Sequence, residues 1–298
     1  MSQRTPHPSR TRVFALATAA IAVDTLMFSA IVPALPIYQQ EMGLSDTAVA
    51  LIFAAFPVAQ LLVALLLPRW VDRAGRRRAL AAGAILLALS GVAFAFTTEP
   101  ITLAIARAVQ GGAAALTWTG ALASVSDVYP TDQLGFRLGL AETAGGGVGL
   151  LGPLVSGVLI DAVGVRDTFL IISVVPLLLT LCVVFVPETA RPSSTAPSIM
   201  AGLLSVARSR GARAGALALI LLAVVEAMLE PLLPLDLSER LGLSSSGIGL
   251  VLALGTAALF LGSPLGGWWS DRAGRRLPLV VGGTITAVAL PFVALGPP

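Results

Sequence analysis

The sequence predicts an all-α, polytopic membrane protein with two parallel six-helix repeats, the second of which stops after its third helix. Three observations support this fold class: long apolar runs, arginines concentrated in alternate loops, and a hexapeptide that occurs twice. The 298 residues are 56% hydrophobic and 12% charged, with a mean hydropathy of +0.90, whereas a soluble domain carries roughly 25% charged residues. This composition excludes intrinsic disorder and argues against a soluble enzyme.

Nine apolar runs are long enough to be transmembrane helices. A bilayer offers no hydrogen-bonding partners, so a chain crosses it as a helix of about 20 apolar residues. The first run is too long for a cleaved signal peptide and has Asp24 at its centre. In chain order, the runs cover approximately 13–35, 47–67, 79–97, 101–123, 134–160, 168–186, 214–235, 246–269 and 277–296.

The arginines predict the orientation of these helices. All 19 basic residues are arginine; sixteen precede the first run or lie in the loops after the second, fourth, sixth and eighth runs, and only Arg166 and Arg240 lie in the opposite loops. Because cytoplasmic loops carry an excess of basic residues, we expect a cytoplasmic N-terminus and a place in the plasma membrane. The basic residues form no single patch, which argues against a nucleic-acid partner despite the net charge of +3.

An internal repeat predicts the domain organisation. The hexapeptide Asp72-Arg-Ala-Gly-Arg-Arg77 recurs as Asp271-Arg-Ala-Gly-Arg-Arg276, an offset of 271 − 72 = 199 residues, and Gly43-Leu-Ser45 recurs as Gly242-Leu-Ser244 at the same offset. Parallel repeats of this kind are typical of secondary transporters. We expect a cytoplasmic tail at 1–12, a six-helix bundle at 13–187, a cytoplasmic linker at 188–213 and a partial second bundle at 214–298.

The same repeat predicts a length. The first copy ends near residue 187, so the second should end near 187 + 199 = 386, whereas the sequence stops at Pro298. We therefore expect the chain to be a partial sequence that lacks helices ten to twelve. The alternative is a nine-helix protein that works as it stands.

Acidic residues inside the apolar runs are candidate binding groups. An ionised side chain at the bilayer centre costs roughly 2.5–3.5 kcal/mol, so an intramembrane acid such as Asp24 usually lines a cavity and acts in transport. Its carboxyl group could hold either a proton or an organic cation, and competition between the two is the minimum chemistry of antiport. Glu226 and Glu230 lie four residues apart and share a helix face. Pro231 and Pro234 are expected to interrupt that helix near its outer end. The alternatives are a protonated Asp24 without a role and a Glu230 that lies in interfacial water.

Two further patterns stand out in the fourth and fifth runs. Arg107 and Gln110 belong to a narrow polar-and-small stripe, and a buried arginine needs an acidic or carbonyl partner, for which Asp24 is a candidate. A purely structural ion pair is the alternative. The fifth run is rich in glycine and includes Gly152, Pro153 and Gly157. Small residues let membrane helices approach closely, which predicts an interface that can slide or, alternatively, simple packing.

Nothing in the sequence resembles an enzyme. The chain has one cysteine and one histidine, Cys182 and His7, so it offers neither a multi-histidine metal site nor a histidine-based triad. It has no phosphate-binding glycine loop and no nucleophile elbow. We therefore expect no cofactor and no metal, and a transporter rather than an enzyme.

These residues resemble the motifs of the major facilitator superfamily. The segments 68–78 and 267–276 resemble its G-x-x-x-D-R-x-G-R-R loop signature, with Pro68 in place of the first glycine. Arg107-Ala-Val-Gln110-Gly111 resembles its helix-four motif. The segment 152–157 resembles its antiporter motif, with Ser156 replacing a glycine. The resemblance implies gating roles for Asp72, Arg73, Gly75, Arg76, Asp271, Arg272, Gly274 and Arg275, and a role in the antiporter motif for Gly152, Pro153 and Gly157.

Within this superfamily the chain looks most similar to drug:proton antiporters, and particularly to vesicular amine transporters, because segments 24–36 and 227–234 resemble their first and seventh helices. The resemblance implies that Asp24 binds amine and proton, that Glu230 lines the central cavity, and that Arg107 takes part in proton coupling. It also implies a monomer when full length. Those vesicular transporters carry a lysine in helix two where this chain has Phe56, so the substrate is expected to be a cationic or amphipathic small molecule rather than a defined amine.

Three functional readings follow. The first is a proton-coupled efflux antiporter of the multidrug type that works by alternating access, whose partners are a small-molecule substrate, protons and the lipid bilayer. The second is an exporter of a neutral or anionic metabolite, with Arg107 as the binding charge. The third is a non-transporting remnant or partner subunit.

Overall fold

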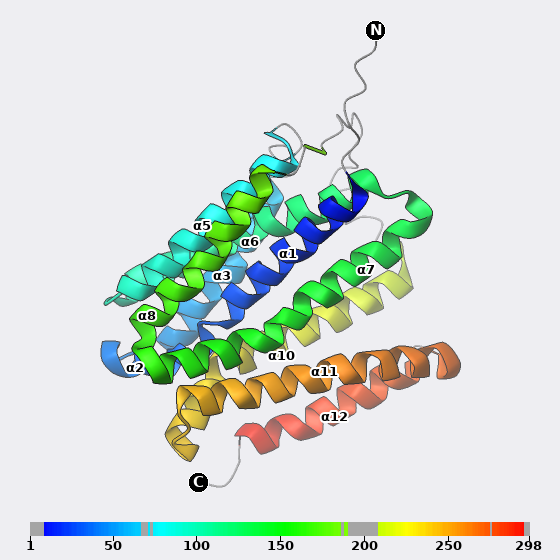
Figure 1. The fold of residues 1–298 in the computed structure, drawn as a ribbon. Helices are drawn as coiled ribbons and strands as arrows, with labels where there is room; N and C mark the ends of the chain where they lie inside the picture. Colours follow the sequence, from blue (N-terminus) through cyan, green and yellow to red (C-terminus); the bar gives the residue numbers. More distant parts are fainter. Residues whose placement is uncertain are drawn as a thin grey trace.

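The computed structural model describes residues 9–66, 71, 74–185, 188–189, 208–274 and 276–294, and every regular element in this part of the chain is helical (Figure 1). The principal helices are α1 (Arg10–Ser29), α2 (Leu35–Met42), α3 (Asp46–Leu66), α5 (Arg76–Phe96), α6 (Pro100–Val128), α7 (Thr131–Gly147), α8 (Leu151–Val184), α10 (Arg210–Leu241), α11 (Ser245–Ala273) and α12 (Arg276–Ala294). Each apolar run expected from the sequence coincides with helix in these described residues.

The first expected span is divided at its end. After α1, the chain forms a single 3-10 turn at Val32–Ala34 and then α2. Pro33 and Pro36 explain this break, because a proline has no backbone N–H to donate and its ring clashes with the preceding helical turn. Tyr38 anchors α2 by donating a hydrogen bond of 2.7 Å from its hydroxyl to the Phe94 carbonyl of α5.

The fifth and sixth expected spans are also divided differently from the prediction. Helix α7 ends at Gly147, a 3-10 turn covers Val148–Leu150, and α8 then continues through both remaining pieces. At Gly164 the backbone has φ 83° and ψ 167°, so the chain bends there. Only glycine adopts such angles without strain, and Gly164 therefore marks the junction that the sequence analysis placed between residues 160 and 168.

The prediction that Pro231 and Pro234 interrupt the seventh expected span, 214–235, is wrong. Helix α10 runs through both prolines without a break. Each proline removes one N–H from the backbone ladder, but a membrane helix tolerates this where neighbouring helices or local adjustments satisfy the freed carbonyl. The proline pairs Pro33/Pro36 and Pro231/Pro234 thus differ in effect, since the first divides its helix and the second does not.

Other repeated positions share their backbone geometry. Gly43 after α2 and Gly242 after α10 both adopt the left-handed conformation, with φ 63° and 60°. Two residues further on, the hydroxyls of Ser45 and Ser244 each accept a backbone N–H in the first turn of the next helix, both at 3.3 Å. This combination ends one helix and begins another within three residues. The local structure therefore repeats at the offset of 199 seen in the sequence.

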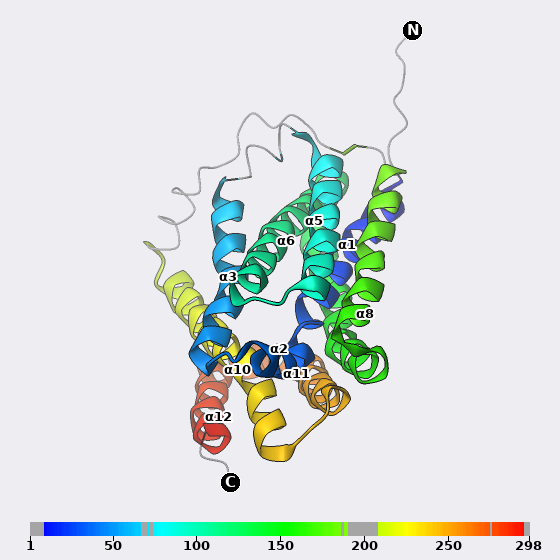
Figure 2. The same ribbon diagram turned by 90° about the vertical axis from the view of Figure 1, so that its left-hand side faces the viewer.

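The helices form two neighbouring groups (Figures 1 and 2). In Figure 2, α1, α3, α5, α6 and α8 stand side by side, with α2 across one end, where α10 and α11 approach. Four helical stretches of the described chain are long and apolar enough to cross a membrane: Arg10–Met42, Asp46–Leu66, Arg76–Phe96 and Thr131–Val184. Many large apolar side chains on the outer faces are exposed, such as Leu66 and Ile101, as expected for surfaces that face lipid rather than water.

Candidate functional site

Asp24 is buried at the centre of the α1–α6 interface. Its side chain is 3% exposed, and its Oδ2 atom accepts a hydrogen bond of 2.8 Å from the indole Nε1 of Trp118 in α6. Among the described residues, Oδ1 has no hydrogen-bond partner. An indole N–H only donates, so Trp118 holds one carboxylate oxygen. The other oxygen is the place where a proton or an N–H donor could bind.

Glycines of α7, of the 3-10 turn at Val148–Leu150 and of α8 pack against the same stretch of α1. A Cβ added to Gly149 would lie 2.7 Å from the Thr25 side chain, and one added to Gly145 or Gly152 would collide with Ile21 or Ser29. The contacted residues of α1 are spaced by four, so they lie along one face of the helix. The segment from the end of α7 to the start of α8 therefore approaches α1 closely on either side of Asp24. Any larger residue at these glycines would push this segment away from α1.

Arg107 lies in an aromatic cluster in the interior of the protein. The residue is 0% exposed, and its guanidinium carbon is 4.1 Å from the centre of the Phe53 ring, 5.0 Å from Phe56 and 5.2 Å from Phe28. Its Nη1 atom donates to Gln110 Oε1 at 2.7 Å. Stacking on aromatic faces stabilises a cation by about 0.5–2 kcal/mol for each pair, which offsets part of the cost of burial.

Gln110 connects this cluster to α1. Its side-chain Nε2 donates to the Met27 carbonyl at 2.8 Å, while its Oε1 accepts from Arg107. Gln110 is 0% exposed. Two nitrogens of Arg107, Nε and Nη2, have no hydrogen-bond partner in the described part of the chain. The arginine thus retains donors that an acceptor group could use.

The structure does not pair Arg107 with Asp24, as the sequence analysis suggested it could. Asp24 bonds to Trp118, which lies eleven residues beyond Arg107 on α6, or roughly 16 Å along the helix axis. The carboxylate that acts electrostatically on Arg107 is that of Glu230, from α10. Asp24 therefore lies beside the Trp118 indole, whereas Glu230 lies towards Arg107.

Glu226 and Glu230 both lie within α10, four residues apart as predicted. Glu230 is partly buried, and its side chain is not without an interaction partner. The side chain of Glu226 lies outside what the structure describes, so its predicted place on the same face as Glu230 stays a prediction.

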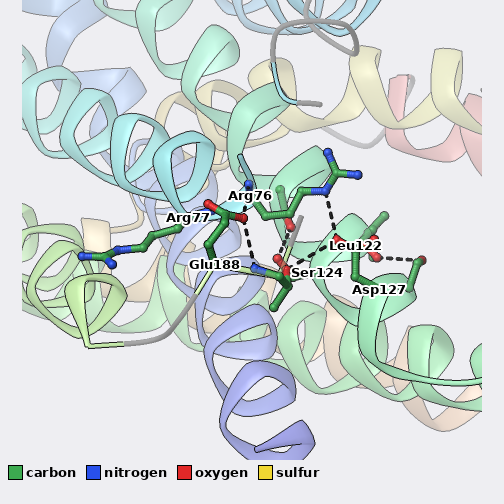
Figure 3. Close-up of polar contacts among 9 residues, drawn as sticks. Arg76, Arg77, Leu122, Ser124, Asp127 and Glu188 are labelled. Atoms are coloured by element: carbon green, nitrogen blue, oxygen red, sulfur yellow. Dashed lines mark hydrogen bonds and ion pairs between the residues drawn. The ribbon is translucent and has the colours of Figure 1, made fainter. Parts of the chain in front are cut away.

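A network of charges surrounds the repeated loop motif (Figure 3). Gly75 has φ 97°, and the Glu188 carboxylate accepts the backbone N–H groups of Arg76 at 2.8 Å and Arg77 at 3.2 Å, at the start of α5. The Arg76 Nε atom forms an ion pair of 3.1 Å with Asp127 of α6. The free N–H groups at a helix start carry a partial positive charge. Glu188, which follows α8 in the chain, therefore binds the start of α5 through its carboxylate.

Several predicted motif residues cannot be placed in the same way. Asp72, Arg73 and Arg275 lie outside the described residues, as does the side chain of Asp271. In the second copy, Gly274 again has positive φ, 76°, and Arg272 is exposed. The repeated glycine therefore has the same backbone role in both copies.

The antiporter-motif residues divide between two neighbours. Gly152 lies against Ser29 of α1, whereas Gly157 lies against the Ser245 backbone of α11, and the Pro153 carbonyl lies against Gly249 of α11. These approaches leave no room for a Cβ on either glycine. The motif thus brings α8 into close contact with both α1 and α11, and sliding at this interface stays a prediction.

Asp161, just beyond this motif, reaches the start of α11. Its Oδ1 and Oδ2 atoms accept the backbone N–H groups of Ser245 at 3.2 Å and Ser246 at 2.9 Å. The residue is exposed and lies between the spans expected at 134–160 and 168–186. Partial burial opposes its ionisation, but the hydrogen bonds from Ser244, Ser245 and Ser246 outweigh that effect and hold the pKa of Asp161 below its ordinary value.

The sequence analysis missed several residues of these sites. Trp118, Phe53, Asp127, Glu188 and Asp161 were not singled out. Asp127 and Glu188 lie a few residues after apolar runs and Asp161 directly follows one, which was the only available signal. Their partners lie 51, 112 and 84–85 residues away in the chain.

The comparisons with known proteins agree with this architecture. A family model described as Major Facilitator Superfamily matches residues 17–224 and 215–298. The chain is 27% identical over 174 residues to multidrug resistance protein 2 of Bacillus subtilis, covering 58% of this chain and 43% of that protein. It is 28% identical over 256 residues to the human chromaffin granule amine transporter, covering 84% of this chain and 47% of the relative. The chain thus spans less than half the length of these relatives.

A solved structure shows the same fold. The crystal structure of a bacterial homologue of the human lysosomal transporter Spinster, in an inward-facing, unoccupied conformation, superposes with a TM-score of 0.73 at 20% identity. The match covers 93% of this chain and 65% of that one. The chain belongs to the major facilitator superfamily, a family of membrane transporters, and it is a multi-pass membrane protein. Its relatives include multidrug resistance proteins and vesicular amine transporters.

A tryptophan substitution tests the bond to Asp24. Trp118→Phe keeps an aromatic ring but removes the donor, and a buried hydrogen bond to a charged group contributes about 1.5–3 kcal/mol. We expect the thermal midpoint in detergent to fall by about 3–10 °C, given the usual relation between free energy and midpoint for a chain of this size. The matched control is Trp269→Phe in α11, which we expect to have little effect. An unchanged midpoint in Trp118→Phe would show that the bond adds no stability.

Proposed function

We propose that this chain forms the binding site of a proton-coupled efflux antiporter for cationic or amphipathic small molecules. The observation that carries the proposal is Asp24, a buried carboxylate with one oxygen held by Trp118 and the other without a partner among the described residues. Such a group binds a proton or an ammonium ion at the same atom, so the two compete. The multidrug resistance proteins and the amine transporter among its relatives support a cationic substrate.

The proposed cycle uses alternating access. A cation displaces the proton from Asp24 while the site faces the cytoplasm, and protonation from the opposite side releases the cation. The arginine distribution supports a cytoplasmic N-terminus and a place in the plasma membrane. The repeated backbone geometry supports two bundles, at 13–187 and from 214 onward, joined by a linker at 188–213. We propose that the protein is a monomer when full length, with no nucleic-acid partner and no enzymatic activity.

Arg107 supports a second candidate function. Two of its guanidinium nitrogens have no hydrogen-bond partner in the described chain, and a carboxylate or phosphate group could accept from both. On this reading the chain exports an anionic metabolite. Glu230 argues against it, because its negative charge acts on the same arginine and would repel an anion.

Substrate-dependent proton release distinguishes these functions. The protein, solubilised in lightly buffered detergent with a pH-sensitive dye, is mixed with a lipophilic cation such as tetraphenylphosphonium or with an amphipathic anion of similar size. We expect about one proton per bound cation at most and none with the anion. Proton uptake on binding of the anion, with no release by the cation, would support the second function. A chain that releases no proton and is rapidly degraded in cells would support a third reading, a non-transporting remnant or subunit.

A further inference from the structure

The start of α11 lacks a feature that its counterpart in the first copy has. Helix α3 begins with Asp46, so a carboxylate lies in its own first turn. The corresponding residue at the offset of 199 is Ser245, and α11 has no acidic residue in its first turn. A helix start carries unpaired N–H groups and a partial positive charge, so a carboxylate there is stabilising.

Asp161 supplies this carboxylate from another helix. Its two oxygens accept from Ser245 and Ser246, and the Ser244 hydroxyl accepts from Gly247 at 3.3 Å. Three successive N–H groups in the first turn of α11 are thereby satisfied, two of them by α8. The contact joins the part of the chain before residue 185 to the part after residue 208.

The surrounding packing places this contact at the end of a tight interface. Gly157 of α8 and Gly249 of α11 each lie against the other helix's backbone, and both contacts lie on the same side of the carboxylate, farther into the α8–α11 interface. The contact lies at the end of the bundle where Arg166 and Arg240 occur, opposite the arginine-rich loops. Asp161 is exposed, so water can replace the serine N–H groups when the two helices part.

We infer that Asp161 is a latch that holds α8 and α11 together at the arginine-poor end and must release for that end to open. This inference rests on the proposed alternating-access function, in which each end opens in turn. The latch is reversible because Asp161 is exposed, so water can take the place of its hydrogen-bond partners when the two helices part. It biases the equilibrium towards the closed arrangement of this end without blocking the transition.

Spin labels across the interface test the latch directly. With Cys182 replaced by serine, cysteines at Val158 of α8 and Leu250 of α11, which are 50% and 51% exposed, carry the labels. Double electron–electron resonance in nanodiscs then reports the distance between the helices. In Asp161→Asn, we expect the ratio of open to closed populations to rise by about two- to ten-fold, as for loss of a charged group at a helix start.

Two further variants make the test specific. Asp167→Asn carries the same chemical change at an exposed residue of α8 beyond the Gly164 bend, and we expect no shift. Ser245→Pro removes one of the two backbone donors at a position where proline suits a helix start, because Ser244 already has an extended conformation, φ −69° and ψ 167°. We expect it to shift the populations in the same direction as Asp161→Asn.

The measurement needs neither substrate nor transport, so it separates the latch from the antiport proposal. Unchanged distances in folded Asp161→Asn and Ser245→Pro proteins would overturn the latch, even if proton-coupled efflux is observed. A shift towards the open distance in both variants supports the latch, even if no cation is transported. An equal shift in Asp167→Asn would overturn it as well, since the effect would then be one of surface charge.

Discussion

Replacing Asp24 by asparagine is expected to abolish proton-coupled efflux. Asparagine keeps the size of the side chain and an oxygen that can accept from Trp118 Nε1, so the fold should persist. It removes the negative charge and the group that exchanges a proton. Loss of one partner of a buried ion pair costs about 3–5 kcal/mol, which corresponds to cation binding weaker by more than about one hundred-fold.

The measurement is efflux of a fluorescent cation from proteoliposomes under an imposed pH gradient. We expect Asp24→Asn to show only the rate of protein-free vesicles, with no proton released on cation binding. Asp132→Asn, at an exposed acid in the first turn of α7, is the matched control and should transport normally. Undiminished, gradient-dependent efflux by Asp24→Asn would remove Asp24 from the mechanism and leave Glu230 as the remaining described candidate.

A single methyl group at Gly111 is expected to lower the stability of the protein. A Cβ at this position would lie 3.0 Å from the Phe56 Cα and would collide with the Phe56 carbonyl of α3. Neither atom belongs to a flexible side chain, so α3 and α6 would have to separate. Overpacking of this kind costs about 1–3 kcal/mol, and we expect Gly111→Ala to lower the thermal midpoint in detergent by about 3–10 °C.

The neighbouring glycine provides the control. A Cβ on Gly112 would make an ordinary contact of 3.5 Å with the Val63 side chain. Alanine also favours a helix more than glycine does, so Gly112→Ala should leave the midpoint unchanged or raise it. Equal midpoints for the two variants would mean that α3 yields easily at Phe56. A further consequence is expected at Arg107, because moving α3 also moves the Phe53 and Phe56 rings away from its guanidinium.

Composition and spacing predicted much of the fold because they reflect forces that act locally. Hydropathy located the helices, and the repeated Gly-Leu-Ser triplet marked two positions that share a left-handed glycine and a serine cap. The proline pattern was less informative. Pro33 coincides with a divided helix and Pro231 does not, although a proline removes one backbone N–H at both places.

The candidate site was only partly predictable. Asp24 and Arg107 could be found from sequence because charged residues inside apolar runs are costly. Their partners could not, since the bond from Trp118 to Asp24 depends on how α6 is rotated against α1. The same holds for Asp161, whose partners 84–85 residues later are backbone N–H groups and leave no trace in residue type.

The span divided into α7 and α8 connects α1 with α11. Before the 3-10 turn at Val148–Leu150, Gly145 rests on α1 near Asp24; after it, Gly157 rests on α11. Gly152 also lies after that turn and rests on Ser29 of α1, so α8 touches α1 and α11 at once. A displacement of α11 would therefore press on the helix that carries Asp24 through α8 itself, without first passing through the turn at Val148–Leu150.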